Sequence, residues 1–139
     1  MSNGDCIFCK IGAGEMESTK LYETDNVVAI LDINPVNPGH TLIVPKKHSV
    51  NLLDADEAVL SEMMVVTKKV AQAIVDAFEE YDGFNLNSNN GRIAGQVIPH
   101  MHWHIVPRKL NDGLQLWPGK EYKEGEREQL ADLIKSKLS

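Results

Sequence analysis

The stretch "HMHWHIVPR", from His100 to Arg108, alternates histidines with apolar residues. Successive side chains of a strand point to opposite faces, so the alternation predicts one histidine face and one apolar face. The histidines are His100, His102 and His104, and the outer two lie about 13 Å apart on a regular strand. Zinc needs ring nitrogens about 2.0–2.1 Å away, so the three are not expected to share one ion. We instead expect one end histidine in a structural site and the others facing an anion such as phosphate.

Composition and charge narrow the class of protein. The chain has 139 residues, 42% hydrophobic and 24% charged, which is typical of one globular domain. Its formal net charge of −6 argues against a nucleic-acid partner, because duplex binding needs a basic surface. The sequence lacks the ~18 consecutive apolar residues of a membrane span and a secretory signal pattern, so no membrane partner is expected. Two cysteines in such a chain indicate reduced thiols and a cytoplasmic location.

Outward from the histidine stretch, the hydrophobic pattern predicts an α+β fold with a mostly antiparallel sheet. A long amphipathic helix is expected from Asp54 to about Glu80, with Asp54 as its N-cap and both Met63 and Met64 in the core. A C-terminal helix is expected over about 124–138. Strands are expected over 20–25, 26–33, 40–46, 83–89 and 100–106, the last ending before Pro107.

A glycine-bearing loop, "NNGRIAGQVIPH", leads into the histidine stretch. Gly91 and Gly95 permit a tight turn and a close approach of backbone to a ligand. Backbone N–H groups in such a turn can cradle an anion, and Asn89 and Gln96 add amide donors. The loop therefore favours phosphate binding beside the histidines.

The N-terminal pair Cys6 and Cys9 leaves three interpretations open: a redox pair, half of a metal site, or two incidental small residues. A thioredoxin-type pair follows a strand and opens a helix, and nothing strand-like precedes Cys6. A zinc site needs two further ligands. The spacing of Cys6 and Cys9 does not by itself identify these two ligands.

Several motifs together resemble the histidine triad (HIT) superfamily. They are "N-x-G-x-x-A-G-Q" from Asn89 to Gln96, the "H-x-H-x-H-I-V-P-R" that follows, and "AILDINPVNPGHTLIVPKKH". The N-terminal "CIFCKI" resembles the Hint branch. This resemblance implies a single HIT domain over residues 1–139, with a core over about 5–110 and a tail over about 111–139. It also implies a HIT-like fold that forms a homodimer.

The same resemblance implies a nucleotide-binding hydrolase or transferase. Such an enzyme releases a purine nucleoside 5′-monophosphate, AMP or GMP, from phosphoramidate-type substrates through a nucleotidyl-histidine intermediate. Carried over by position, His102 would be the nucleophile and His104 would assist the leaving group. His40 would either support them or have a structural role. Two alternatives remain: hydrolysis of dinucleoside polyphosphates, as in the fragile-histidine-triad branch, and a nucleotide-responsive binding module with incidental catalysis.

Substrate contacts also follow from the resemblance. Asp32 would hold the ribose hydroxyls, and the phosphate would meet Asn89, Gly95, Gln96 and the backbone of Val97. Several Hint-type members have Ser or Thr at the Val97 position, so a hydroxyl is missing here. The base would lie among apolar side chains at Ile7, Phe8, Ile11, Leu31 and Ile33.

A structural zinc is the last implication. The resemblance assigns its ligands to Cys6, Cys9, His48 and His100, an ordinary Cys₂His₂ set. It also allows Trp117, in the tail, to approach the active site of a second copy. Ordinary packing of Trp117 is the slightly favoured interpretation.

Overall fold

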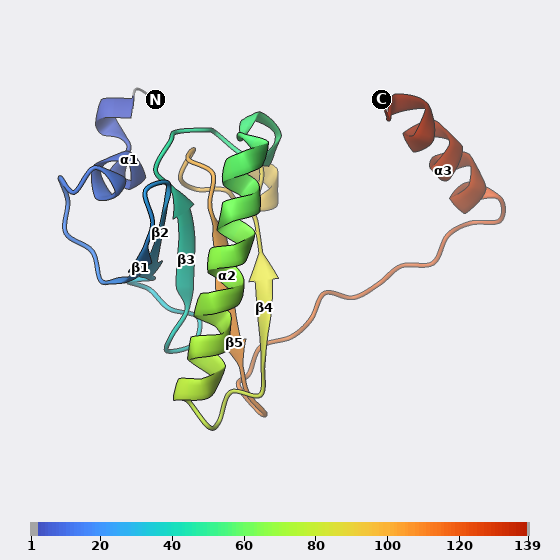
Figure 1. The fold of residues 1–139 in the computed structure, drawn as a ribbon. Coiled ribbons are helices and arrows are strands. Elements are labelled where there is room, and N and C mark those ends of the chain that lie inside the picture. The colour runs from blue at the N-terminus through green and yellow to red at the C-terminus, as the bar shows by residue number, and fades with distance from the viewer. Residues whose placement is uncertain (1–2, 139) are drawn as a thin grey trace.

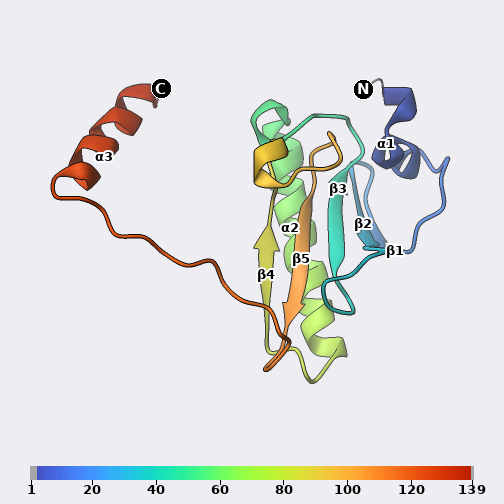
Figure 2. The ribbon, with the colours of Figure 1, turned by 180° about the vertical axis from the view of Figure 1, so that it is seen from behind.

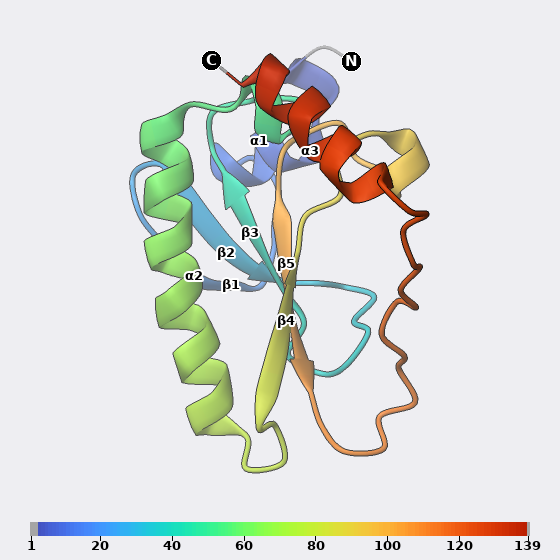
Figure 3. The ribbon, with the colours of Figure 1, turned by 90° about the vertical axis from the view of Figure 1, so that its right-hand side faces the viewer.

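A five-stranded sheet carries the fold of the computed structural model, which describes residues 3–138. Its strands follow the order β1-β2-β3-β5-β4, and every neighbouring pair is antiparallel, which confirms the predicted α+β class. Helix α2 crosses one face of the sheet and α1 lies toward the other (Figures 1 and 3). The strands are β1 (Lys20–Glu23), β2 (Val27–Leu31), β3 (Thr41–Pro45), β4 (Gly83–Asn87) and β5 (Trp103–Arg108). The helices are α1 (Ile7–Gly12), α2 (Glu57–Ala77) and α3 (Glu126–Lys137), with short 3₁₀ turns at Asn3–Asp5, Leu52–Asp54 and Arg92–Ala94.

Alternate residues of the central strands feed two separate cores. In β2, Val27 and Ala29 face α2, whereas Val28 and Ile30 face α1. Helix α2 adds Met63, Val66, Val70, Ala71 and Ile74 to the first core. Each of the Met, Val and Ile side chains contributes about 1.5–3 kcal/mol when fully buried, so the packing of α2 on the sheet contributes substantially to stability.

The start of α2 differs from the sequence expectation. The N-cap is Asp56, whose Oδ1 accepts the N–H groups of Ala58 and Val59. Asp54 instead closes the preceding 3₁₀ turn, where it accepts the N–H groups of Val50 and Asn51. Both Asp54 and Asp56 are suitable N-cap residues. Because Asp54 is part of the preceding 3₁₀ turn, Asp56 caps the helix. Met63 is buried as expected, whereas Met64 is about half exposed.

Strand β5 begins later and ends later than predicted. It runs from Trp103 to Arg108, so His100 and His102 precede it. Pro107 lies inside the strand because β3 starts at Thr41, opposite Ile105, and no longer borders β5 at Pro107. The predicted separation of faces nevertheless holds. The apolar set Met101, Trp103 and Ile105 lies in the α2 core.

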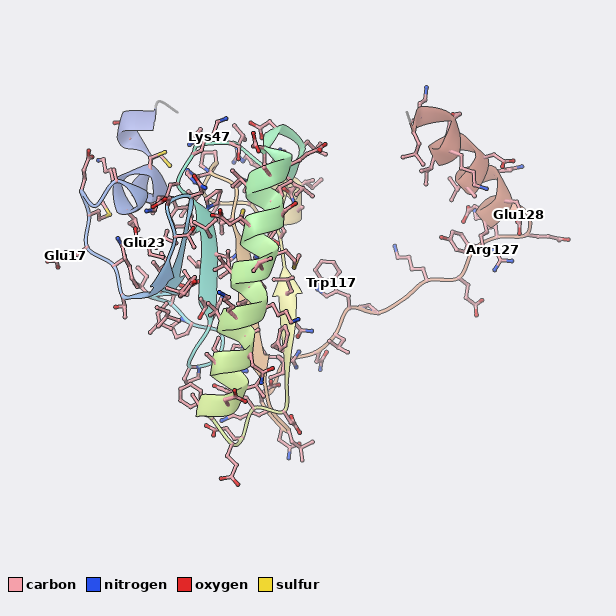
Figure 4. The ribbon with its side chains drawn as sticks, in the orientation of Figure 1. Glu17, Glu23, Lys47, Trp117, Arg127 and Glu128 are labelled. Carbon is pink, nitrogen blue, oxygen red and sulfur yellow. The ribbon has the colours of Figure 1, made fainter. Side chains whose placement is uncertain are left out.

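The C-terminal segment leaves the sheet after β5 and ends in the predicted helix. Helix α3 stands apart from the strands in Figures 1 and 2. Trp117 lies on the extended tail (Figure 4) and is 94% exposed, so it does not pack on its own chain as expected. Within residues 3–138, no helix has the length and apolarity needed to cross a bilayer.

Candidate active site and metal centre

A pocket of about 490 Å³ opens on the α1 side of the sheet. This volume lies within the range of roughly 300–1,000 Å³ that is usual for small-molecule sites. His102 and His104 line it together with nine of the ten residues expected to contact substrate: Ile7, Phe8, Ile11, Leu31, Asp32, Ile33, Asn89, Gly95 and Val97. Segments far apart in the sequence therefore converge where the resemblance placed a nucleotide.

His102 is held by the backbone just before it. Its Nδ1 donates to the carbonyl oxygen of His100 at 2.7 Å, and the edge of the Phe8 ring lies against it, with 4.9 Å between ring centroids. Burial lowers the pKa of His102 below its usual value. The neutral ring therefore has its proton on Nδ1 and a lone pair on Nε2. That lone pair is the requirement for a nucleophile.

His104 is half-buried and contacts the buried His40, which does not line the pocket. His40 Nε2 lies 2.8 Å from His104 Nδ1 and 3.5 Å from Asp32 Oδ2. The other nitrogen of His40, Nδ1, accepts the backbone N–H of Val36 at 3.1 Å. Burial, together with the neighbouring His102 and His40, lowers the pKa of His104 to about 4. Both rings are thus neutral near pH 7.

The glycine loop has the tight geometry that its sequence predicts. Gly91 and Gly95 have φ angles of 92° and 91°, which side chains with a Cβ rarely adopt. Gln96 differs from expectation, because it does not line the pocket. Its Nε2 donates to the carbonyls of Val50 and Ile98, and its Oε1 accepts the Gly91 N–H at 2.9 Å. Both N–H groups of the Gln96 side-chain amide are thus hydrogen-bonded within the protein and are not available to a ligand.

Some pocket residues had no signal in the sequence. Ser18 has the only buried side-chain oxygen or nitrogen without a hydrogen-bond partner among residues 3–138. It lines the pocket beside Thr19 and Met16, all contributed by the segment between α1 and β1. The segment has no sequence motif, so only the folded structure shows that it lines the pocket.

A separate cluster gathers at the N-terminal end of the histidine stretch. One ligand atom from each of Cys6, Cys9, His48 and His100 lies within 4.8 Å of the others. Cys6 Sγ is 3.2 Å from His100 Nδ1, Cys9 Sγ is 3.3 Å from His48 Nδ1, and the two Nδ1 atoms are 3.1 Å apart. Cys6 also caps α1, where its Sγ accepts the Cys9 N–H.

This donor set fits zinc. A zinc tetrahedron with Zn–N of about 2.0–2.1 Å and Zn–S of about 2.3 Å has edges of roughly 3.3–3.8 Å. The measured separations between neighbouring donors, 3.1–3.5 Å, are close to those edges. His100 donates Nε2–H to the Pro45 carbonyl at 2.7 Å, which leaves the Nδ1 lone pair directed into the cluster. Burial and the adjacent Cys6 raise the pKa of Cys9 to about 11, so metal binding would have to release the thiol proton.

Comparison with known proteins places this geometry in a family. The family model described as "HIT domain" matches residues 13–111. The chain belongs to the HIT family. It is 36% identical over 135 residues to adenosine 5′-monophosphoramidase hnt1 of Schizosaccharomyces pombe, covering 96% of this chain and 98% of that protein. It is 48% identical over 110 residues to adenylylsulfatase HINT3 of Arabidopsis thaliana, covering 79% of this chain and 55% of that protein.

Solved structures of HIT proteins share the fold. A HIT-family member from Bacillus subtilis superposes with a TM-score of 0.89 at 38% identity, covering 97% of this chain and 98% of that one. A zinc-bound histidine triad protein from Mycobacterium smegmatis superposes with a TM-score of 0.77 at 34% identity, covering 98% and 100%. The HIT-like fold expected from the sequence is therefore confirmed.

Proposed function

We propose that this HIT protein is an enzyme that cleaves a nucleoside 5′-monophosphate from phosphoramidate-type substrates through a nucleotidyl-histidine intermediate. One observation carries the proposal: His102 donates Nδ1–H to the His100 carbonyl and thereby presents an Nε2 lone pair at the pocket. The names of the fungal and plant relatives, a monophosphoramidase and an adenylylsulfatase, support hydrolysis of a bond to adenylate.

The reaction has two displacements at phosphorus. His102 Nε2 forms a bond to the α-phosphorus while the bond from phosphorus to the leaving group breaks, and the leaving group departs with that electron pair and takes up a proton from solvent. Water then forms a P–O bond as the P–N bond to His102 breaks, and the proton that this water loses returns to solvent, so bonds and protons balance. The backbone N–H of Val97 and the amide of Asn89 offer donors to the phosphate oxygens, and Gly95, whose N–H donates to the Arg92 carbonyl, allows close approach of the backbone.

The nucleoside would occupy the part of the pocket lined by Asp32 and the apolar side chains. The carboxylate of Asp32 lines the same pocket as His102 and His104 and could accept both ribose hydroxyls. The apolar side of the pocket contains Ile7, Phe8 and Ile11 from α1, together with the exposed Ile33. Aliphatic and aromatic surfaces bind a purine by contact area, so AMP and GMP moieties are both expected substrates.

Zinc at the cluster would have a structural role. Cys6, Cys9, His48 and His100 would be its ligands, and the bound ion would supply a cross-link between α1, the segment after β3 and the histidine stretch. Because four protein ligands close the site, no position remains for substrate. The free thiols of Cys6 and Cys9 also favour the cytoplasm as the compartment.

A second copy of the chain is the proposed partner. Strand β4 lies at the edge of the sheet, and its side chains Phe84 and Leu86 are exposed. They line an apolar groove with Met64 and Val65 of α2. An unpaired edge with apolar side chains is a template for strand pairing, so we place the homodimer interface there. Sedimentation equilibrium should show a dimer for the native chain and a monomer for Leu86→Lys.

Intact-mass spectrometry after rapid mixing with adenosine 5′-phosphoramidate tests the chemistry. Native protein should acquire one adenylate transiently, and His102→Gly should acquire none while still binding AMP. His104→Ala is the matched control, because it changes a pocket histidine but keeps the nucleophile. AMP binding without an adduct or AMP release would reject the enzyme in favour of a binding module. Faster turnover of diadenosine polyphosphates than of the phosphoramidate would reassign the substrate class.

A further inference from the structure

A chain of hydrogen bonds runs from a loop backbone to the pocket through the buried ring of His40 and the half-buried ring of His104. It begins at the N–H of Val36, which donates to His40 Nδ1 at 3.1 Å. It continues from His40 Nε2 to His104 Nδ1 over 2.8 Å. A peptide N–H can only donate, so the direction of the first bond is fixed by covalent structure.

That direction decides where each neutral imidazole carries its proton. His40 Nδ1 accepts from Val36, so the single ring proton of His40 is on Nε2. Two nitrogens 2.8 Å apart share one proton, and here His40 provides it. His104 Nδ1 is then the acceptor, and the proton of His104 is on Nε2, the nitrogen that no residue in 3–138 occupies.

We propose that His40 is a positioning residue: with the Val36 N–H, it fixes His104 in the Nε2–H form, so that His104 presents a hydrogen-bond donor to the leaving-group atom. His40 itself is buried and does not line the pocket. It therefore acts through His104 and need not contact substrate. The kinetic consequence rests on the proposed nucleotidyl chemistry, whereas the position of the proton does not.

The alternation of histidines does not predict this result. His102 and His104 lie two residues apart and both enter the pocket, yet their protons are on opposite ring nitrogens. One ring is thereby a nucleophile and its neighbour a donor without either being charged. A pair of neutral rings also avoids the repulsion that two adjacent imidazolium groups would have.

The proton position can be measured without turnover. Proton–nitrogen NMR correlation spectra of labelled protein at pH 7 distinguish protonated from unprotonated ring nitrogens. The chain has five histidines, so His104 can be assigned from the signals missing in His104→Asn. We expect Nε2–H on His104 in the native protein and a mixture of both forms in His40→Phe. Nδ1–H on native His104, or an unchanged form in His40→Phe, would overturn the proposal.

Two matched pairs separate positioning from mere packing. His40→Gln keeps an amide N–H near the place of Nε2–H, whereas His40→Phe keeps ring bulk but no donor. Val36→Pro removes the N–H that starts the chain, and Val36→Ala keeps it. The donor-free variants should shift the His104 proton, and the donor-retaining variants should preserve it. If His40→Phe fails to fold, the Val36 pair and the native spectrum still decide.

Kinetics supply the second readout. In His40→Phe, kcat/KM for adenosine 5′-phosphoramidate should fall roughly tenfold to a hundredfold, the effect of one misplaced donor to a poor leaving group. For the para-nitrophenyl ester of AMP, whose leaving group needs no donor, kcat/KM should fall less than about twofold. Equal losses on both substrates would show a general structural role and overturn the proposal. Absence of any adduct on native His102 would reject the proposed reaction but leave the NMR assignment to stand.

Discussion

Two groups of histidines share one short stretch of this chain, and they are built in different ways. At its start, His100 joins His48 and two cysteines in a cluster whose donor atoms converge on one point. Two residues later, His102 and then His104 turn toward a pocket of about 490 Å³. The same side chain at the same spacing thus forms a closed centre and an open one.

The difference lies in which ring nitrogen the surrounding protein occupies. His100 gives Nε2–H to the Pro45 carbonyl and keeps Nδ1 free for a metal. His102 gives Nδ1–H to the His100 carbonyl and keeps Nε2 free for the pocket. The backbone therefore assigns each histidine its role, and the side-chain alternation only brings the rings together.

Loss of the nucleophile should give the largest effect and should affect only the open centre. In His102→Ala, kcat/KM for adenosine 5′-phosphoramidate should fall by at least about a thousandfold, because the proposed covalent intermediate forms on this ring. Zinc content measured by atomic emission should stay at the native value. A comparable loss of zinc in His102→Ala would show that the metal cluster depends on the pocket histidine, so the two centres would not be independent.

Removal of the metal should produce the reverse pattern. A ligand that binds only the folded state adds about 4 kcal/mol at a thousandfold excess over its Kd, which is roughly 8–16 °C in Tm for a chain of this size. Chelator-treated protein should therefore unfold about 10 °C lower by calorimetry, and added zinc should restore the native Tm. His48→Ala is the matched variant, because it removes one ligand and no pocket residue. An unchanged Tm in both would show that the cluster holds no metal.

Acid should destabilise the folded chain through the protonation of His104, a residue of the open centre. Its pKa is lowered to about 4 in the folded chain, against about 6.5 when unfolded, so the unfolded state binds the proton first as the pH falls. Stability is therefore complete above about pH 6.5 and declines toward pH 4. Urea titrations should show that the free energy of unfolding falls about 1–2 kcal/mol less in His104→Asn than in the native chain between pH 6.5 and 4.5. Parallel pH curves would indicate that His104 is already accessible to protons in the folded state.

Much of this arrangement follows from sequence patterns, and the remainder depends on contacts between distant segments. Period-two alternation was enough to place Met101 and Trp103 on the α2 face and the histidines on the other. The choice of ring nitrogen was not predictable for His104, because it depends on a backbone N–H in the loop at Val36. The hydrogen-bond partners of Gln96 were not predictable for the same reason, since the Val50 carbonyl that accepts its amide N–H lies on another segment.

The smallest expected effect concerns Val97, which lines the pocket and is 90% exposed. A hydroxyl at this position would lie beside the proposed phosphate site at Asn89 and Gly95, where it could donate to the phosphate or to the leaving group. Val97→Ser should therefore raise kcat/KM for the phosphoramidate by about twofold to tenfold, the range of one added solvent-accessible hydrogen bond. Val97→Ala is the control, because it changes side-chain size without adding a donor. Neither variant should alter zinc content or Tm, because the exposed Val97 side chain contributes little to packing. A rate gain shared by serine and alanine would point to relief of crowding by valine and not to the hydroxyl.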